Sequence, residues 1–220
     1  MTTTSDLETM VERIRADLTR KNETRDLTLE RSRALIRYCA NSIRGTHRHE
    51  FRLAEELLAE ARVAAQTMCA DARAFADVYY AGYLQDALKE LAEAAIILSV
   101  VKGDPLPEPE AWGIEYPAYL NGLGEAMGEA RRAALDCMRR GEITEAERLL
   151  RVMDDVLSYL VTIDFPDSLT GNLRRTTDMV RGVTERTRGD LTTAVREEKL
   201  QEALRAFEER LNARDGVVKA

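Results

Sequence analysis

Residues 84–101 read LQDALKELAEAAIILSVV, and this stretch predicts a helix. It contains neither Gly nor Pro, and it opens with residues that favour helices before any β-branched residue appears. At about 100° per residue, four apolar side chains fall on one side of the helix: Leu84, Leu88, Leu91 and Ala95. Asp86, Glu90 and Glu93 fall together on the opposite side. We therefore expect a helix with its apolar side in the core and an acidic side that needs an explanation.

The acidic side has two interpretations. It can be a solvated face, because Glu favours helices and pairs of Glu one turn apart are common on helix surfaces. It can also be half of a metal site, because hard cations such as Mg²⁺ prefer carboxylate oxygens. One helix cannot complete such a site, so the second interpretation requires carboxylates from other helices.

The rest of the chain carries further helical patterns and no convincing strand. We expect helices over these ranges: 7–18, 27–68 with a break near Gly45, 119–140, 144–163, 169–188 and, as a separate amphipathic helix, 191–213. A polar junction at 21–26 is expected to separate the first two helices. Residues 103–117 hold four of the prolines and predict an extended connection. The chain is therefore predicted to be all-α, a single domain over 1–220 with about seven helices.

The composition is that of a folded, helix-rich protein. Hydrophobic residues make up 45% and charged residues 32% of the 220 residues, with only 5 Pro. The longest apolar run, 94–101, is too short to span a bilayer, and residues 1–20 lack the apolar segment of a secretory signal. The three cysteines are widely spaced and form no cluster with His, which indicates reduced thiols and no zinc. We therefore expect a cytoplasmic protein with no membrane partner.

Four arginines form what we call the arginine row: Arg33, Arg37, Arg44 and Arg48. Their spacing keeps them on one side of a helix, and no acidic residue occurs between Arg31 and His49. A plain solvated face is one interpretation, although such faces usually mix the two signs of charge. The other is a phosphate-binding surface, because guanidinium groups bind phosphate oxygens without reading sequence. The net charge of −7 argues only against indiscriminate binding of nucleic acid.

Five segments resemble the translin/TRAX family, in order and with compatible spacing. They are RDLTLERSRALIRY (25–38), ALKELAEA (87–94), YLNGLGEAMGEARR (119–132), LLRVMDDVLSYL (149–160) and GNLRRTTDMVRGVTERTRGDL (171–191). The resemblance covers about residues 20–191. It implies a translin-like bundle of about seven helices and a closed, hollow homo-octamer with RNA held inside.

Within that family, the chain is more similar to TRAX-type subunits, which carry a Mg²⁺-dependent endoribonuclease site, than to translin-type subunits, which only bind RNA or single-stranded DNA. The resemblance places the E-x-x-E of the TRAX site on Glu90 and Glu93. It places the acid of the G-E motif on Glu129 and the aspartate of the later helix on Asp155. The chain lacks the long insertion of animal TRAX, so it resembles a compact archaeal or prokaryotic version.

Three functions follow as hypotheses. The first is a Mg²⁺- or Mn²⁺-dependent endoribonuclease, with single-stranded RNA as the preferred substrate, in which Glu90, Glu93, Glu129 and Asp155 converge on the metal and the arginine row binds RNA. Converging carboxylates favour this hypothesis, because their mutual repulsion and burial are relieved by a divalent cation. The second is a non-catalytic protein that binds RNA or single-stranded DNA, and the third is a purely structural helical assembly.

Overall fold

The computed structural model describes residues 3–218, with side chains from Ser5 to Asn212. Within this range the chain forms nine α-helices and no strand, which confirms the all-α prediction. Six helices are long: α1 (Thr3–His47), α2 (Phe51–Ala72), α4 (Gly82–Lys102), α6 (Tyr116–Arg139), α7 (Ile143–Leu160) and α9 (Leu173–Val218). Three are single turns: α3 (Ala76–Tyr79), α5 (Pro109–Trp112) and α8 (Asp167–Thr170). None of the helices described combines the length and the apolar character needed to cross a membrane.

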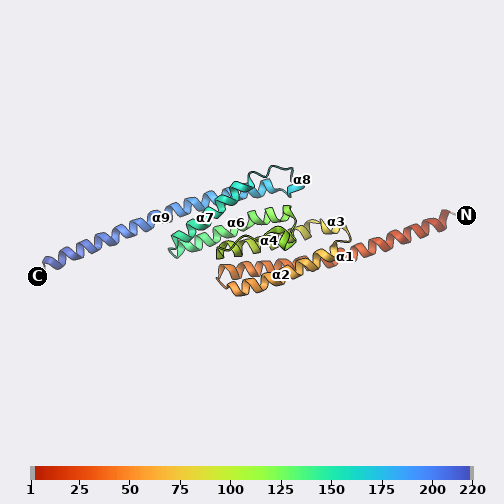
Figure 1. Cartoon of the computed structure of the whole chain (residues 1–220), viewed down its shortest axis with the longest axis horizontal. Coiled ribbons are helices and arrows are strands. Elements are labelled where there is room, and N and C mark those ends of the chain that lie inside the picture. The colour runs from red at the N-terminus through yellow and green to blue at the C-terminus, as the bar shows by residue number, and fades with distance from the viewer. Residues whose placement is uncertain (1–2, 219–220) are drawn as a thin grey trace.

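The long helices lie side by side in an elongated bundle (Figure 1). The α1–α2 hairpin forms one side, α4 packs against it, α6 packs on α4, and α7 and α9 cover the other side of α6. The first half of α1 and the second half of α9 project from opposite ends of the bundle. These two projections are the only long helical segments without neighbours in the part of the chain described.

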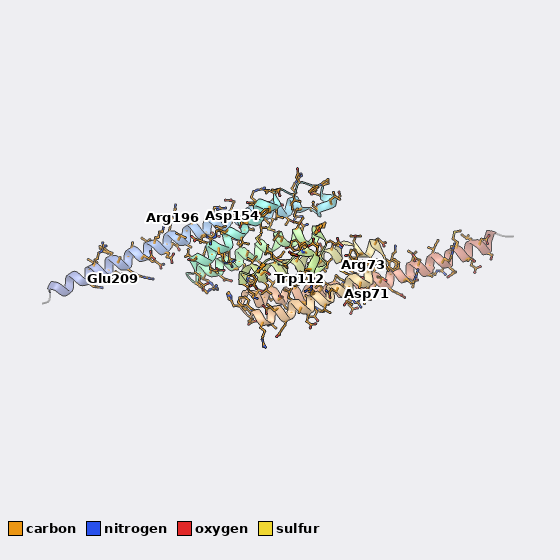
Figure 2. The ribbon with its side chains drawn as sticks, in the orientation of Figure 1. Asp71, Arg73, Trp112, Asp154, Arg196 and Glu209 are labelled. Atoms are coloured by element: carbon orange, nitrogen blue, oxygen red, sulfur yellow. The ribbon has the colours of Figure 1, made fainter. Side chains whose placement is uncertain are left out.

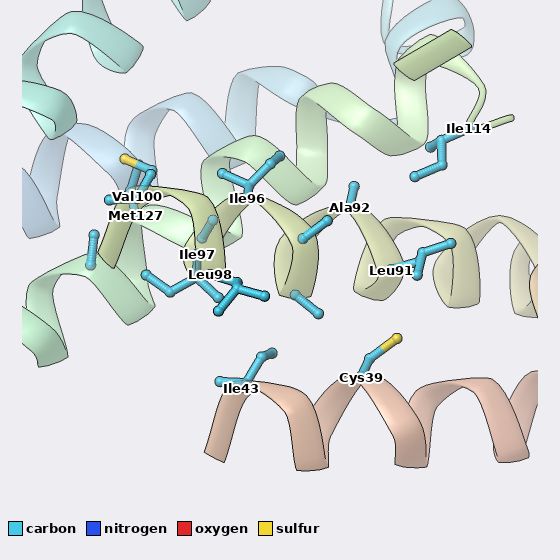
Figure 3. Close-up of a cluster of buried hydrophobic side chains, with 14 of the residues drawn as sticks. Cys39, Ile43, Leu91, Ala92, Ile96, Ile97, Leu98, Val100, Ile114 and Met127 are labelled. Carbon is cyan, nitrogen blue, oxygen red and sulfur yellow. The ribbon is translucent and has the colours of Figure 1, made fainter. Parts of the chain in front are cut away.

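Helix α4 lies at the centre of the core (Figure 3). The four apolar residues predicted to face the core, Leu84, Leu88, Leu91 and Ala95, are all buried. Burial extends further round the helix than expected, to Ala94, Ile96 and Ile97, because α1 and α2 cover one side of α4 and α6 covers another. Glu90 and Glu93 of α4 therefore emerge half-buried between packed helices, whereas Asp86, nearer the start of α4, is exposed.

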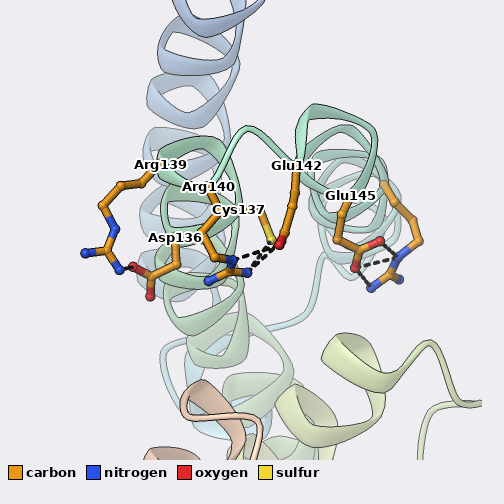
Figure 4. A network of polar contacts seen from close by, with 7 residues as sticks. Asp136, Cys137, Arg139, Arg140, Glu142 and Glu145 are labelled. Atoms are coloured by element: carbon orange, nitrogen blue, oxygen red, sulfur yellow. Dashed lines mark hydrogen bonds and ion pairs between the residues drawn. The ribbon is translucent and has the colours of Figure 1, made fainter.

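Residues with left-handed backbone end several of the helices. Gly103 ends α4 with a φ of 75°, a backbone conformation that glycine adopts readily, and Gly141 makes the turn after α6 with the same φ. In the α6–α7 turn, Arg140 Nη2 donates a 2.7 Å hydrogen bond to Glu142 Oε2 (Figure 4). The break predicted near Gly45 occurs just after His47, where His49 adopts a φ of 58° before α2 begins.

Two predicted helix boundaries are wrong. Residues 21–26 do not interrupt α1, because they contain no Gly or Pro and because Thr24 Oγ1 donates to the Arg20 carbonyl within the helix. Gly189 does not separate a C-terminal helix, and the predicted 191–213 segment is the continuation of α9. A glycine inside a helix costs about 1 kcal/mol relative to alanine, which is too little to end a long helix.

Candidate metal and nucleic-acid site

Three carboxylates from two helices meet at the centre of the bundle. Glu90 and Glu93 come from α4 and Glu125 comes from α6, and one oxygen from each lies within 4.8 Å of the others. All three side chains are half-buried, and no other group of three His, Cys, Asp or Glu residues meets this criterion among the described residues. We call these three residues the carboxylate cluster. It answers the question posed by the acidic side of α4, because a second helix does bring a carboxylate to it.

A glycine allows the two helices to come together at this point. A Cβ atom on Gly122 of α6 would lie 2.6 Å from the Lys89 carbonyl oxygen and 2.7 Å from Ala92 Cβ, both on α4. Only a residue without a side chain fits at that distance. Glu125 follows Gly122 by about one helical turn, so the same contact directs Glu125 toward the acidic residues of α4.

The cluster makes its own ionisation costly. Burial, together with the neighbouring charges of Glu90, Glu125 and Glu129, raises the pKa of Glu93 to about 8. Burial also raises the pKa of Glu90, although nearby Lys89 opposes that shift. A cation bound next to these acids would offset their mutual repulsion and favour their ionised form.

One cation of the chain already lies in the cluster. Lys89 Nζ donates a 2.8 Å hydrogen bond to Glu125 Oε1 and lies 3.9 Å from Glu90 Oε1. Burial acts to lower the pKa of Lys89, but the bond to Glu125 and the other acids raise it overall, so the ammonium stays charged. Lys89 therefore neutralises part of the cluster and occupies a position where a metal ion would compete with it.

Glu129, which was predicted from the resemblance, lies next to the cluster and is held from another side. His47 Nε2 of α1 donates a 2.5 Å hydrogen bond to Glu129 Oε2, and Arg132 lies 3.8 Å from the same oxygen. The bond from His47 lowers the pKa of Glu129. Glu129 is close enough to raise the pKa of Glu93, so it adds negative charge to the site although it is not one of the three converging acids.

Asp155 does not join the cluster within one chain. It lies on the exposed side of α7, whereas Met153 and Val156 on either side of it face the core. Helix α7 packs mainly against α6 and α9, and its Asp154 accepts a 2.6 Å hydrogen bond from Arg188 of α9, on the side of the bundle visible in Figure 2. The convergence expected of Asp155 is therefore not seen, and its place is taken by Glu125.

Sequence reasoning missed three residues of the site: Lys89, Glu125 and His47. Glu125 had a visible signal, because it precedes Glu129 by four residues and shares its side of α6. His47 had none, because its contact with Glu129 joins residues 82 positions apart in the chain. Such a contact depends on how α1 packs beside α6.

Arg33, Arg37 and Arg44 of the arginine row lie along α1, and Arg48 lies in the turn just after it; all four side chains are exposed. None of the four has a carboxylate within 4.0 Å among the described residues, in contrast with Arg31, which pairs with Asp71 of α2. Arg44 makes only a 2.7 Å hydrogen bond to Asn41. The row ends near the site in sequence, because His47, the last residue of α1, contacts Glu129 and is followed directly by Arg48.

An open cleft of about 870 Å³ adjoins the cluster. Lys89 and Glu125 line it on one side, and Asn172 and Arg175, at the start of α9, line it on the other. Asn121, at the bottom of the cleft, is buried and fully engaged, since it donates to the Pro117 and Thr170 carbonyls and accepts from Thr176. The cleft gives a large polar molecule a way to reach the carboxylates.

No family model matches the chain, but one curated protein is similar to it over most of its length. Over 193 residues the chain is 30% identical to an uncharacterised protein of Methanocaldococcus jannaschii, in an alignment that covers 86% of this chain and 84% of that protein.

The solved structures that are similar to this chain include three structures of C3PO, two of AfC3PO and one of NeC3PO. The crystal structure of AfC3PO is 30% identical with a TM-score of 0.75, and the structure of AfC3PO in complex with duplex RNA is 29% identical with a TM-score of 0.78. The crystal structure of apo-NeC3PO has a TM-score of 0.77 at 19% identity, which supports the fold alone. Each match covers 84% of this chain and 96% of the other.

Proposed function

The chain belongs to the translin/TRAX family, and on that basis we propose that it is a metal-dependent endoribonuclease that binds and cleaves RNA inside a hollow homo-oligomer. The observation that carries the proposal is the convergence of Glu90, Glu93 and Glu125 from two different helices. Half-buried acids that repel one another lower the stability of the fold. A cluster of such acids beside a cleft is therefore a candidate functional site. Metal binding at a cleft is such a role.

The chemistry of the cluster fits a hard divalent cation. All the donors are carboxylate oxygens, which Mg²⁺ and Mn²⁺ prefer over softer metals. Glu90, Glu93 and Glu125 would hold the ion, with Glu129 beside them. When bound, such an ion supplies an activated water and offsets negative charge on the phosphate that is cleaved.

The other residues of the site have separate tasks in this proposal. His47 fixes the orientation of Glu129 through its 2.5 Å hydrogen bond. With a metal ion held by the cluster, Lys89 would no longer be needed to offset the charge of Glu125, and its ammonium group would be available for a phosphate oxygen in the adjoining cleft.

The arginine row supports the binding of RNA. Exposed guanidinium groups without acidic partners have their full charge available for phosphate oxygens. Among similar proteins, AfC3PO has been solved in complex with duplex RNA. We propose that this chain binds RNA, and also single-stranded DNA, through the row, and that it assembles as a homo-octamer as the family resemblance implies.

A second function is favoured by Lys89. Because its ammonium group already compensates two of the carboxylates, the cluster can also be an internal ion-pair network in a protein that binds RNA without cleaving it.

The variant Lys89→Gln distinguishes the two functions. In a metal site, the variant loses thermal stability without metal and regains it when Mg²⁺ is added. In an ion-pair network, Mg²⁺ does not restore the loss. Lys102→Gln, which removes an exposed lysine paired with Glu55, is the control.

The decisive experiment measures cleavage of labelled RNA, single-stranded and duplex, with Mg²⁺, Mn²⁺ or EDTA. Wild type is compared with Glu90→Ala/Glu93→Ala and with a matched control, Glu56→Ala/Glu60→Ala, which removes two exposed carboxylates from α2. We expect cleavage that needs metal, survives in the control and disappears in the cluster variant while RNA binding remains. RNA binding without cleavage in all three proteins would instead establish the non-catalytic function.

A further inference from the structure

The first part of α1 is an amphipathic helix that runs clear of the bundle as far as Lys21, which pairs with Asp77 of α3. We call residues 5–26 the N-terminal arm, which projects from one end of the bundle (Figure 1). Its large apolar side chains are between 40% and 57% exposed: Leu7, Met10, Val11, Ile14 and Leu18. Single exposed apolar residues are common on proteins, but a continuous line of them indicates a surface that another molecule covers.

The spacing of these residues is that of a coiled coil. Leu7, Val11, Ile14 and Leu18 follow one another at alternating intervals of four and three residues, so they occupy the core positions of heptads. The same intervals, continued past Lys21 and Arg25, reach residues of α1 that are buried in the bundle: Thr28, Ser32, Leu35 and Cys39. The apolar side of the arm is therefore an extension of the side of α1 that packs in the bundle, beyond the point where packing partners end.

We propose that the N-terminal arm pairs with the same arm of a second copy of the chain, antiparallel and about a two-fold axis. Leu7 of one copy then packs against Leu18 of the other, and Val11 packs against Ile14. A two-fold axis repeats each contact, so four layers of apolar side chains are buried.

Charges beside the apolar line favour this arrangement. Glu8 and Arg15 are seven residues apart and flank the same edge of the line. Antiparallel pairing brings Glu8 of each copy next to Arg15 of the other, which gives two pairs of opposite charge. Glu8 has no ion-pair partner in its own chain among the described residues, and Arg15 pairs only with the neighbouring Glu12.

Other partners for the arm give no such match. Parallel pairing of two arms places Met10 next to Arg15 and Asp17 next to Asn22, which forms no pair of opposite charge. The projecting half of α9 also has an exposed apolar line: Leu200, Leu204, Phe207 and Leu211. Antiparallel pairing with that line brings Glu8 next to Glu208, which is a repulsive contact. The self-paired arm is the arrangement that the charges select.

This inference concerns how copies of the chain associate and does not depend on the nuclease activity. A charge exchange in the full chain tests it. Glu8→Arg and Arg15→Glu each place like charges together twice, and each is expected to weaken self-association by roughly five- to tenfold. The double variant restores opposite charges and is expected to return toward wild type. Arg13→Glu makes the same charge change on the far side of the arm and serves as the control.

Sedimentation over a range of protein concentrations measures the association of all five proteins. If the two single changes weaken association and the double variant weakens it further, the charges do not meet across the interface and the proposal is wrong. A second measurement reports on the arm even if other surfaces dominate the assembly. We expect a disulfide when Val11→Cys chains are mixed with Ile14→Cys chains, beyond that in either protein alone. Linking of Val11→Cys chains only to one another would show parallel pairing, and no added linking in any sample would exclude the paired arm.

Discussion

At the scale of single residues, Glu93 carries most of the electrostatic cost of the site. Its carboxyl group is half-buried, and the negative charges of three other glutamates surround it, so its pKa rises to about 8. Near neutral pH without metal it therefore holds a proton in the folded protein, whereas in the unfolded chain it is ionised above about pH 4.5. A divalent cation would reverse this preference, because it binds only the ionised form.

The sign of the pH dependence follows from this difference. Between about pH 4.5 and 8 the folded protein binds more protons at Glu93 than the unfolded chain does, so this residue lowers the free energy of unfolding as pH rises through that range. The variant Glu93→Gln keeps the neutral shape. We expect it to be as stable as wild type near pH 4 and more stable at pH 8.5, by up to about 5 kcal/mol. Urea unfolding in EDTA at both pH values measures the difference, and equal stability at pH 8.5 would show that Glu93 ionises freely.

Glu125 and Asp155 test two different assignments of the third acid of the site. The structure points to Glu125, and the family resemblance points to Asp155. Glu125 lies within the carboxylate cluster, whereas Asp155 is exposed on α7. If the proposed function holds, we expect Glu125→Gln to reduce metal-dependent RNA cleavage at least a hundredfold, because it removes one of the three carboxylates proposed to hold the ion and keeps the side chain's shape. Asp155→Asn should retain cleavage within a fewfold of wild type. The opposite result, with Asp155 essential and Glu125 dispensable, would mean that the site is completed by α7 of another subunit.

At the scale of helices, the site depends on the close approach of α4 and α6. Gly122 makes that approach possible, and Gly128, two turns further along α6, has no atom within 4 Å of the position of a Cβ. We expect Gly122→Ala to lower the free energy of unfolding by about 1–3 kcal/mol and to weaken metal binding, because the helices must move apart. Gly128→Ala should raise stability by up to about 1 kcal/mol, because alanine favours helix. Thermal unfolding of both variants, with and without Mg²⁺, tests this, and equal effects of the two would exclude a special role for Gly122.

Helix boundaries show which local signals can be predicted from sequence. The end of α4 at Gly103 was predictable, since glycine there adopts a φ of 75° that other residues avoid. Residues 21–26 and Gly189 offered weaker signals, polarity in one case and a glycine in the other. Neither supplies a turn that competes with the helix, so α1 and α9 continue through them. The all-α class was predictable because apolar periodicity extends over whole helices and averages out such local errors.

The candidate site was predictable only in part, for a related reason. Periodicity placed Glu90 and Glu93 on one side of α4 and showed that a second helix had to contribute. The choice among Glu125, Glu129 and Asp155 depends on how helices are rotated and packed, which periodicity within one helix does not determine. The contact of His47 with Glu129 depends on the packing of α1 beside α6, and it appears only in the assembled bundle.

At the scale of the whole molecule, charge is divided unevenly over a protein whose net charge is −7. The two projecting helical ends carry both signs in close succession, as Arg196 and Glu209 of α9 illustrate in Figure 2. The arginine row, by contrast, is a run of one sign on the bundle, without acidic partners. The net negative charge disfavours an RNA backbone overall, whereas the arginine row attracts it; Arg48, at the end of the row, follows His47, which contacts Glu129.

Salt dependence tests whether the row binds phosphates. Each arginine that neutralises a phosphate releases counterions, so the double variant Arg37→Ala/Arg44→Ala should lower the slope of log affinity against log salt by about 1.5. The affinity loss should be similar for RNAs of different sequence, because guanidinium contacts to the backbone do not read bases. The control is Arg139→Ala/Arg181→Ala, which removes two exposed arginines that already pair with Asp136 and Asp178. Fluorescence anisotropy from 50 to 300 mM salt measures both slopes. An unchanged slope for the first variant, or an equal change in the control, would mean that RNA binds to another surface of the molecule.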